Sequence, residues 1–247
     1  MKTPAVIDTA AVGAVLFDMD GVLTDTASVH FAAWARLFDS ALPVLAPDVE
    51  HAPFSADDYR RLVDGRARID GVEALLADRG VSVPRGEIDD PPGTETAWAL
   101  ANRKNEFFHE AISTGGVATF ASSITVLDAV RDAGVRTAVV TASRNRADIL
   151  AAAGLSDAFD AAVDGIDIED QGLAGKPAPD TFLEAARRLD VEPARAVVIE
   201  DAVSGVAAGK AGAFGLVVGV ARHDDPEELL AAGAHVVVTD LAELTVL

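Results

Sequence analysis

Five short apolar runs recur along this chain, and segments of helical spacing lie between them. The first run, VGAVLF at residues 12–17, stops abruptly at Asp18. Runs of this length that are rich in branched residues are typical of strands buried on both faces of a parallel sheet. We therefore predict an α/β fold with a doubly wound, Rossmann-like parallel sheet. The other predicted strands cover residues 136–141, 196–199, 214–220 and 235–239, and the predicted core helices cover 124–133, 146–153, 179–189, 202–211 and 226–232.

A long segment interrupts this alternation after the first run. Residues 26–118 contain no comparable apolar run, and proline-rich or polar connectors divide them into short helical stretches. The predicted helices cover residues 28–38, 56–63, 71–78 and 96–112. We therefore predict a helical cap domain at residues 26–118, inserted into an α/β core made of residues 1–25 and 119–247.

The charge balance excludes several classes of partner. Asp and Glu number 40 against 20 Lys and Arg, so the formal net charge is −20. Such a surface repels nucleic-acid phosphates and anionic lipid, so we expect no nucleic-acid or membrane partner. The absence of Cys excludes disulfides and thiolate chemistry and fits a reducing compartment. No apolar run resembles a signal peptide or a membrane span, and we expect a cytoplasmic monomer.

Polar side chains gather where the predicted strands end. Doubly wound sheets bind their ligands beyond the carboxyl ends of their strands, so these side chains should converge. Four carboxylates at one edge are unfavourable unless a divalent cation lies among them, and oxygen ligands suit Mg²⁺. We therefore predict a Mg²⁺ site there, with a lysine offsetting the remaining charge. The converging residues are Asp18, Asp20, Thr141, Ser143, Lys176, Glu200 and Asp201.

The D-x-D pair after the first strand has a specific chemical use. The carboxylate of Asp18, paired with a metal, can attack a phosphoryl group and form an aspartyl phosphate. Asp20 lies two residues further on and can act as general acid and base. Alone, such a pair is equally well a solvated turn. A solvated turn does not explain why Thr141, Lys176 and the acidic pair also occur, each at the end of a later predicted strand or in a loop between strands.

The ordered segments DMDGVLTDT, TAS, KP and ED, which begin at residues 18, 141, 176 and 200, resemble the four motifs of haloacid dehalogenase-like phosphotransferases. The helical insertion after the first motif is similar to the small cap of that superfamily, and within it the chain resembles the β-phosphoglucomutases. In that family the nucleophile, the second aspartate's backbone carbonyl and the acidic pair hold the metal. The resemblance thus implies Asp18, Asp20, Glu200 and Asp201 as metal ligands.

The same resemblance implies substrate contacts in the cap. His30 matches the histidine that gates the general acid/base aspartate of that family. Gly65 and Arg68 match the cap loop that meets the substrate, although Arg66 is close enough to serve instead of Arg68. Lys104 matches a substrate-contacting lysine. In the core, the loop that binds the distal phosphate and the sugar corresponds to Ser143, Arg144 and Asn145.

The activity implied by the resemblance is a Mg²⁺-dependent interconversion of β-D-glucose 1-phosphate and glucose 6-phosphate. It would proceed through an aspartyl-phosphate enzyme and glucose 1,6-bisphosphate. The alternative is a sugar-phosphate phosphatase with the same core, in which water attacks the aspartyl phosphate; the cap residues, chiefly Lys104, separate the two. Two alternatives from other classes of protein fit the sequence less well. A phospho-acceptor receiver module carries its phosphorylated aspartate after a later strand and has no large insertion after the first strand. A D-x-D glycosyltransferase has a metal motif that does not require Lys176 or the acidic pair.

Overall fold

The computed structural model describes residues 5–64, 66–222 and 226–247. The chain forms two compact units. The core unit comprises the described residues up to Asp25 and those from Val117 to Leu247, and the cap unit comprises Thr26–Gly116. The second boundary between the units therefore lies two residues before the predicted one. Gly65, one of the predicted substrate contacts, lies outside the described residues.

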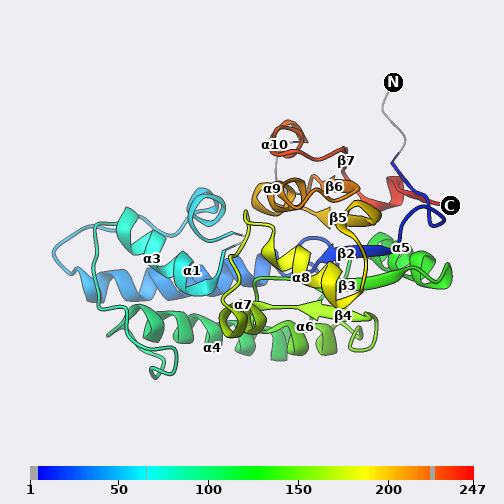
Figure 1. Cartoon of the computed structure of the whole chain (residues 1–247). Helices are drawn as coiled ribbons and strands as arrows, with labels where there is room; N and C mark the ends of the chain where they lie inside the picture. Colours follow the sequence, from blue (N-terminus) through cyan, green and yellow to red (C-terminus); the bar gives the residue numbers. More distant parts are fainter. Residues whose placement is uncertain (1–4, 65, 223–225) are drawn as a thin grey trace. The chain divides into compact units, whose positions relative to one another are not determined.

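A parallel sheet with the strand order β4-β3-β2-β5-β6-β7 forms the centre of the core unit (Figure 1). From β2 the chain winds outward through β3 and β4, and it then returns to the other side of β2 to form β5, β6 and β7. The direction of winding reverses beside β2, and a crevice at such a reversal is where these sheets bind ligands. The predicted doubly wound sheet is confirmed. The strands are β2 (Ala14–Asp18), β3 (Arg136–Val140), β4 (Ala161–Val163), β5 (Ala196–Glu200), β6 (Leu216–Val220) and β7 (Val236–Val238).

Helices bury the sheet because its central strands are apolar on both faces. Every residue of β2 and of β5 is buried. On one face, Leu16 packs with Phe182 of α8 (Asp180–Arg188) and Val206 of α9 (Val203–Ala211). α10 (Pro226–Ala232) joins this cluster, and α5 (Ala121–Asp132) packs against β3. The remaining core helices are α6 (Arg146–Ala152), α7 (Gly165–Gln171), η2 (Pro193–Arg195) and η3 (Leu241–Glu243).

The five predicted strands are all present, with ends within two residues of the predicted ones. The sequence pattern missed β4, because its short Ala-Ala-Val run has weak β propensity and lies at the edge of the sheet. It also missed α7, and a two-residue pairing between β1 (Val6–Ile7) and β8 (Thr245–Val246) near the chain ends. These elements depend on tertiary contacts rather than on a local pattern.

The cap unit is helical, as predicted, and its two long helices lie side by side (Figure 1). The first of these, α1, continues to Leu45, although the predicted helix ends at residue 38. Pro43, which lacks a backbone N–H, lies inside α1, and its neighbour Leu42 is buried in the cap core. The helices are α1 (Ala27–Leu45), α2 (Ala56–Asp58), η1 (Tyr59–Val63), α3 (Arg68–Asp78) and α4 (Ala97–Gly115).

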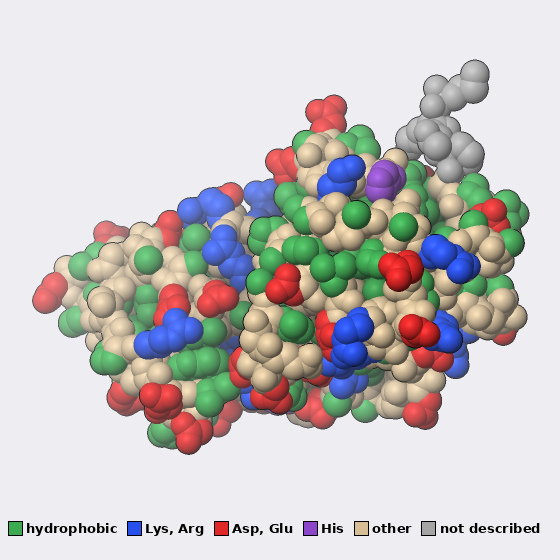
Figure 2. Space-filling view, viewed as in Figure 1, with side chains coloured by type: hydrophobic (Ala, Val, Ile, Leu, Met, Phe, Trp, Pro, Cys, Tyr) green, Lys and Arg blue, Asp and Glu red, His purple; other side chains and the backbone are tan. Residues whose placement is uncertain are grey.

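The surface shows how the acidic composition is distributed. On the face shown in Figure 2, the basic side chains of the described residues are scattered among acidic ones and small apolar patches. Many arginines are paired with carboxylates, such as Arg188 with Asp167 at 2.6 Å. Among the described residues, no helix combines the length and the apolar character that crossing a membrane requires.

An ion-pair cluster on α8 leads to a prediction about acid stability. Hydrogen bonds from Arg187, together with Arg188, lower the pKa of Glu184 to about 2. A carboxyl whose pKa falls on folding stabilises the fold above its unfolded pKa near 4.5, and this contribution disappears as the pH falls toward 2. Because solvent screens Arg187, we expect Glu184→Gln to lower the free energy of unfolding by roughly 1 kcal/mol at pH 7.

Urea unfolding at two pH values tests this prediction. The difference between wild type and Glu184→Gln should be present at pH 7 and should shrink markedly near pH 3. The exposed Glu192 supplies the control, because Glu192→Gln should change little at either pH. If Glu184→Gln lowered the free energy of unfolding equally at both pH values, Glu184 would act through packing rather than through its charge.

Candidate active site

The carboxyl ends of β2, β3 and β5 are level with one another. Asp18 is in register with Val140, the last residue of β3, and Phe17 is in register with Ile199 of β5. The next residue along each neighbouring strand is Thr141 or Glu200, so both lie at the same edge as Asp18. Asp18, Thr141 and Glu200 are 7%, 3% and 0% exposed. The sheet therefore brings these three predicted site residues together in a buried position.

Lys176 connects two of the carboxylates. Its Nζ lies 2.5 Å from Asp18 Oδ1 and also pairs with Glu200 Oε1. The side chain of Lys176 is 5% exposed, and its Nζ lies 5.0 Å from the centroid of the Phe182 ring. An ammonium in this position offsets part of the charge that the two buried carboxylates bring with them.

The electrostatics of this cluster leave an excess of negative charge. Burial raises the pKa of Asp18 well above its usual range, and the carboxylates of Glu200 and Asp20 raise it further, against the opposing effect of Lys176. Burial alone would lower the pKa of Lys176, but Asp18 and Glu200 outweigh it and raise that pKa above its ordinary value. An additional cation at this position would therefore favour the ionised form of Asp18.

Three carboxylates of the core unit are close enough to share such a cation. Asp18, Glu200 and Asp201 each offer an oxygen atom, and these atoms lie within 4.8 Å of one another. Hard oxygen donors in this number suit Mg²⁺ or Ca²⁺ rather than a metal that prefers sulfur or nitrogen ligands. The donor set and the charge excess both fit a divalent cation.

A tight turn after β2 carries Asp20. The Gly21 N–H donates to the Thr24 carbonyl at 2.8 Å, and the Thr24 N–H donates to the Met19 carbonyl at 2.9 Å. Thr141 Oγ1 donates to Asp20 Oδ2 at 3.3 Å, so the residue after β3 contacts the second aspartate directly. Asp20 and Thr141, two of the predicted site residues, are therefore in contact.

Two glycines allow the acidic groups to approach the backbone. Gly21 has φ +88°, and a Cβ there would lie 1.8 Å from Asp201 Oδ2. A Cβ on Gly205, in α9, would lie 1.8 Å from Glu200 Oε1. The sequence analysis did not identify Gly205. The only local signal is its position one turn after the acidic pair, in EDAVSG.

The loop of Ser143, Arg144 and Asn145 follows Thr141 and is held by the start of α7. The Ser143 carbonyl accepts a hydrogen bond from the Gly165 N–H at 3.1 Å, and Ser143 Oγ accepts one from the Asn145 N–H at 3.1 Å. Arg144 pairs with Glu169 of α7. Sequence reasoning missed Glu169, because no pattern connects residues 25 positions apart.

In the cap unit, α1 and α4 bring His30 and Lys104 together. Lys104 Nζ lies 2.7 Å from His30 Nδ1, and Lys104 is 3% exposed. The same Nζ lies 5.0 Å from the Trp34 ring centroid and 4.8 Å from that of Phe108. The His30 ring stacks on Phe108 with 4.3 Å between centroids. An ammonium donating to Nδ1 places the proton of a neutral imidazole on Nε2.

The two arginines considered for the substrate contact, Arg68 and Arg66, differ in their surroundings. Arg68 begins α3 and is partly buried, and its Nη2 donates to Asn102 Oδ1 at 3.5 Å. Arg66 is exposed, and its Nη2 donates to the Arg61 carbonyl at 3.3 Å. Asn102, two residues before Lys104, thus contacts Arg68 within the cap unit.

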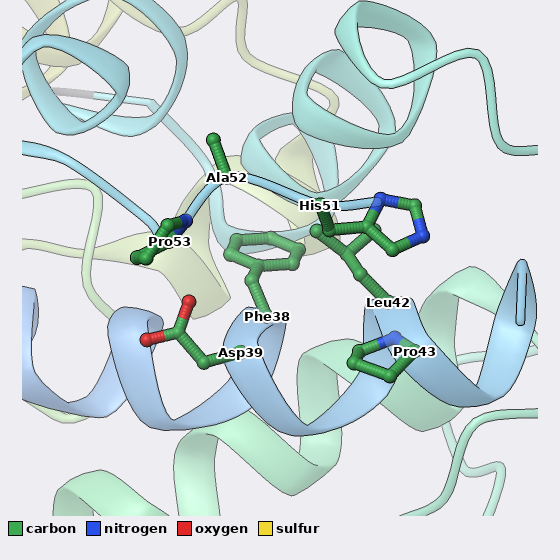
Figure 3. A pocket seen from close by; sticks show the side chains of 7 residues that line it. All are labelled: Phe38, Asp39, Leu42, Pro43, His51, Ala52 and Pro53. Carbon is green, nitrogen blue, oxygen red and sulfur yellow. The ribbon is translucent and has the colours of Figure 1, made fainter. Parts of the chain in front are cut away.

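A separate pocket of about 230 Å³ lies elsewhere in the cap unit (Figure 3). It is formed by one side of α1 and by the segment that follows this helix. None of the predicted site residues lines it. Its lining residues are Phe38, Asp39, Leu42, Pro43, His51, Ala52 and Pro53.

Comparison with known proteins agrees with this architecture. A family model described as haloacid dehalogenase-like hydrolase matches residues 12–212. A β-phosphoglucomutase from Mycobacterium bovis is 47% identical, covering 94% of this chain and 91% of the relative. A phosphorylated carbohydrates phosphatase from Thermotoga maritima is 30% identical, and the match covers 95% of this chain and 97% of the relative. The crystal structure of β-phosphoglucomutase from Clostridium difficile superimposes with a TM-score of 0.74 at 26% identity. The match covers 95% of this chain and 93% of that chain.

The doubly wound core and the helical insertion, together with these likenesses, define an enzyme of the haloacid dehalogenase superfamily. The chain belongs to the haloacid dehalogenase-like hydrolases and, within them, to the β-phosphoglucomutase family. The resemblance found in the sequence motifs is thus confirmed.

The close contact at Gly205 predicts an unusual response to alanine. Replacing a helical glycine by alanine ordinarily stabilises a helix by about 0.5–1 kcal/mol. In Gly205→Ala the new methyl group would meet the buried carboxylate of Glu200, so we expect a loss of stability instead. Gly115, in α4, has no atom within 4 Å of a Cβ position and supplies the control. Urea unfolding should show Gly115→Ala neutral or stabilised, and a stabilised Gly205→Ala would contradict the close approach.

Proposed function

We propose that this enzyme is a Mg²⁺-dependent β-phosphoglucomutase that interconverts β-D-glucose 1-phosphate and glucose 6-phosphate through an aspartyl phosphate and glucose 1,6-bisphosphate. The observation that carries the proposal is the buried Asp18 carboxylate, in contact with Lys176 and close to the acidic pair. The relative that shares 47% identity is named as a mutase, which supports this substrate and this reaction.

The proposed chemistry assigns a role to each core residue. A carboxylate oxygen of Asp18 attacks the phosphorus atom, and the bond from phosphorus to the sugar oxygen breaks. Asp20 gives its proton to the departing oxygen, and in the second half-reaction it takes the proton from the attacking hydroxyl. Thr141 orients Asp20 through their contact at 3.3 Å. Lys176 orients Asp18 and limits the charge of the site.

The metal we propose is Mg²⁺, held by Asp18, Glu200 and Asp201 together with Asp20 through its backbone carbonyl. When bound, the ion supplies positive charge to the phosphoryl oxygens and keeps Asp18 ionised. The three clustered carboxylates and the raised pKa of Asp18 support this assignment.

The proposed substrate contacts lie in both units. In the core unit, Ser143, Arg144 and Asn145 bind the distal phosphate and the sugar. In the cap unit, we assign this role to Arg68, Lys104 and Gly65, with His30 gating Asp20. The direct contact between Lys104 and His30 supports a shared role, because a ligand that binds the Lys104 ammonium would change its hydrogen bond with the His30 imidazole.

The second candidate is a sugar-phosphate phosphatase, because the Thermotoga relative is named as one. Purified enzyme should be given β-glucose 1-phosphate, Mg²⁺ and a trace of the bisphosphate, and both glucose 6-phosphate and free phosphate should be followed. A mutase yields glucose 6-phosphate with little free phosphate. Stoichiometric release of free phosphate would replace the mutase proposal by the phosphatase.

The assignment of Asp20 predicts a selective defect. Asp20→Asn should slow sugar-phosphate turnover roughly 100-fold or more, because both half-reactions need a proton partner. Its initial burst of nitrophenol from p-nitrophenyl phosphate should change only a few-fold, because that leaving group needs little protonation. Asp18→Asn should lose both activities. Equal losses of burst and turnover in Asp20→Asn would contradict the general acid/base role.

The assignment of Lys104 predicts a second selective defect. Lys104→Met keeps the apolar stem between Trp34 and Phe108 and removes the ammonium. Mutase turnover should fall about tenfold or more, a change of about 1.4 kcal/mol in the activation free energy, because binding of the non-reacting end of the sugar phosphate is weakened. Hydrolysis of p-nitrophenyl phosphate should change little. The neighbouring Arg103→Met serves as the control, and a loss of both activities in Lys104→Met would make Lys104 a stability residue.

A further inference from the structure

Arg222, just after β6, contacts the turn that carries Asp20. Its side chain is 11% exposed. Nε donates to the Gly21 carbonyl at 3.3 Å, although the two residues are 201 positions apart in the chain. Nη1 donates to Asp240 Oδ2 at 2.8 Å and lies 3.4 Å from the Thr239 carbonyl. One guanidinium therefore joins the turn after β2 to the segment after β7.

The same guanidinium is stacked on an aromatic ring. Its central carbon lies 3.9 Å from the centroid of Phe120, the residue just before α5. The Phe120 N–H in turn donates to the Leu23 carbonyl at 3.0 Å, so Phe120 is itself tied to the far end of the turn. Arg222 thus contacts this turn directly at Gly21 and indirectly through Phe120.

Arg222 meets this turn at Gly21, the residue whose own backbone is the most permissive. Gly21 has no side chain, and its φ of +88° is one of many conformations open to glycine. Within the turn, the Gly21 N–H is fixed by Thr24, but its carbonyl is fixed by Arg222. A rotation at Gly21 would move Asp20, which is covalently next to it.

Asp240 is the partner of Arg222 on the side away from the turn. Asp240 accepts hydrogen bonds from Arg222, from the Ala242 N–H and from Ser122, and these lower its pKa to about 2. Among the described residues, Arg222 Nη2 is buried without a hydrogen-bond partner. Burying an unused donor is unfavourable, so a contact with Asp240 alone would be better made by a smaller group. The guanidinium is explained by its hydrogen bond to Gly21 together with its position over the Phe120 ring.

We propose that Arg222 is a positioning residue that fixes the Asp20–Gly21 turn for the proton-transfer steps of phosphoryl transfer. The inference rests on the proposed function of Asp20 as general acid and base. Arg222 meets the Gly21 carbonyl of this turn, so its effect reaches the chemistry through the turn.

Two substitutions and one control test the inference. Arg222→Met removes the hydrogen bonds, whereas Arg222→Lys keeps a charge beside Asp240 but cannot also reach Gly21 and stack on Phe120. Arg136→Met is the matched control, because Arg136 also donates to a backbone carbonyl, that of Leu189. Arg136 is the first residue of β3 and so lies at the amino end of that strand, away from Asp18. The measurements are thermal midpoint, steady-state turnover, and the nitrophenol burst from p-nitrophenyl phosphate.

Both Arg222 variants should reproduce the pattern expected of Asp20→Asn. Turnover should fall about 10- to 100-fold relative to the burst, because a small misplacement of a catalytic group is enough for such a loss. Arg222→Lys should show this loss with a thermal midpoint closer to wild type than that of Arg222→Met. Arg136→Met should lower only the thermal midpoint.

The opposite outcomes are equally clear. The inference fails if either Arg222 variant keeps the wild-type ratio of turnover to burst, or if both variants unfold. A wild-type enzyme that turns over no sugar phosphate would refute the proposed function separately. In that case the ratio of nitrophenyl phosphate turnover to burst still tests Arg222, because water attack on the aspartyl phosphate also needs Asp20.

Discussion

The contact of Lys176 with both Asp18 and Glu200 is the interaction on which the core unit's site depends. Two carboxylates buried at adjacent strand ends repel each other and lose their hydration, and an isolated pair would not stay ionised. One ammonium removes part of this penalty and leaves a net negative charge. The remaining features follow from it: the glycines that admit the carboxylates, and a charge excess that suits a divalent cation.

The sheet determines which groups share this position. Because β2 lies between β3 and β5 in a level register, three strands end at one edge, and each end presents a polar residue. Supporting contacts come from further away. The start of α7 holds the Ser143 loop, and Arg222 holds the turn after Asp20. Strand ends thus supply the buried carboxylates Asp18 and Glu200, while Asp20 and Ser143 lie in loops that other parts of the core unit contact.

The sequence alone could predict the sheet and the position of its polar ends, because an uninterrupted branched run that stops at Asp18 or Glu200 encodes both a buried strand and its carboxyl end. It could not predict β4, whose alanines have little β preference, or the full length of α1 through Pro43. Gly205 and Arg222 were missed because their roles depend on atoms that only the fold brings near, at Glu200 and Gly21.

The two points where the chain leaves and re-enters the core unit are joined to each other. Thr24 pairs with Thr119, and the Asp25 N–H donates to the Ala118 carbonyl at 2.9 Å. The two ends of the cap segment are therefore held next to each other by residues of the core unit. A segment whose ends are already held together can change in length at a small entropic cost, so we expect the cap segment to tolerate insertions and deletions without separating β2 from β3.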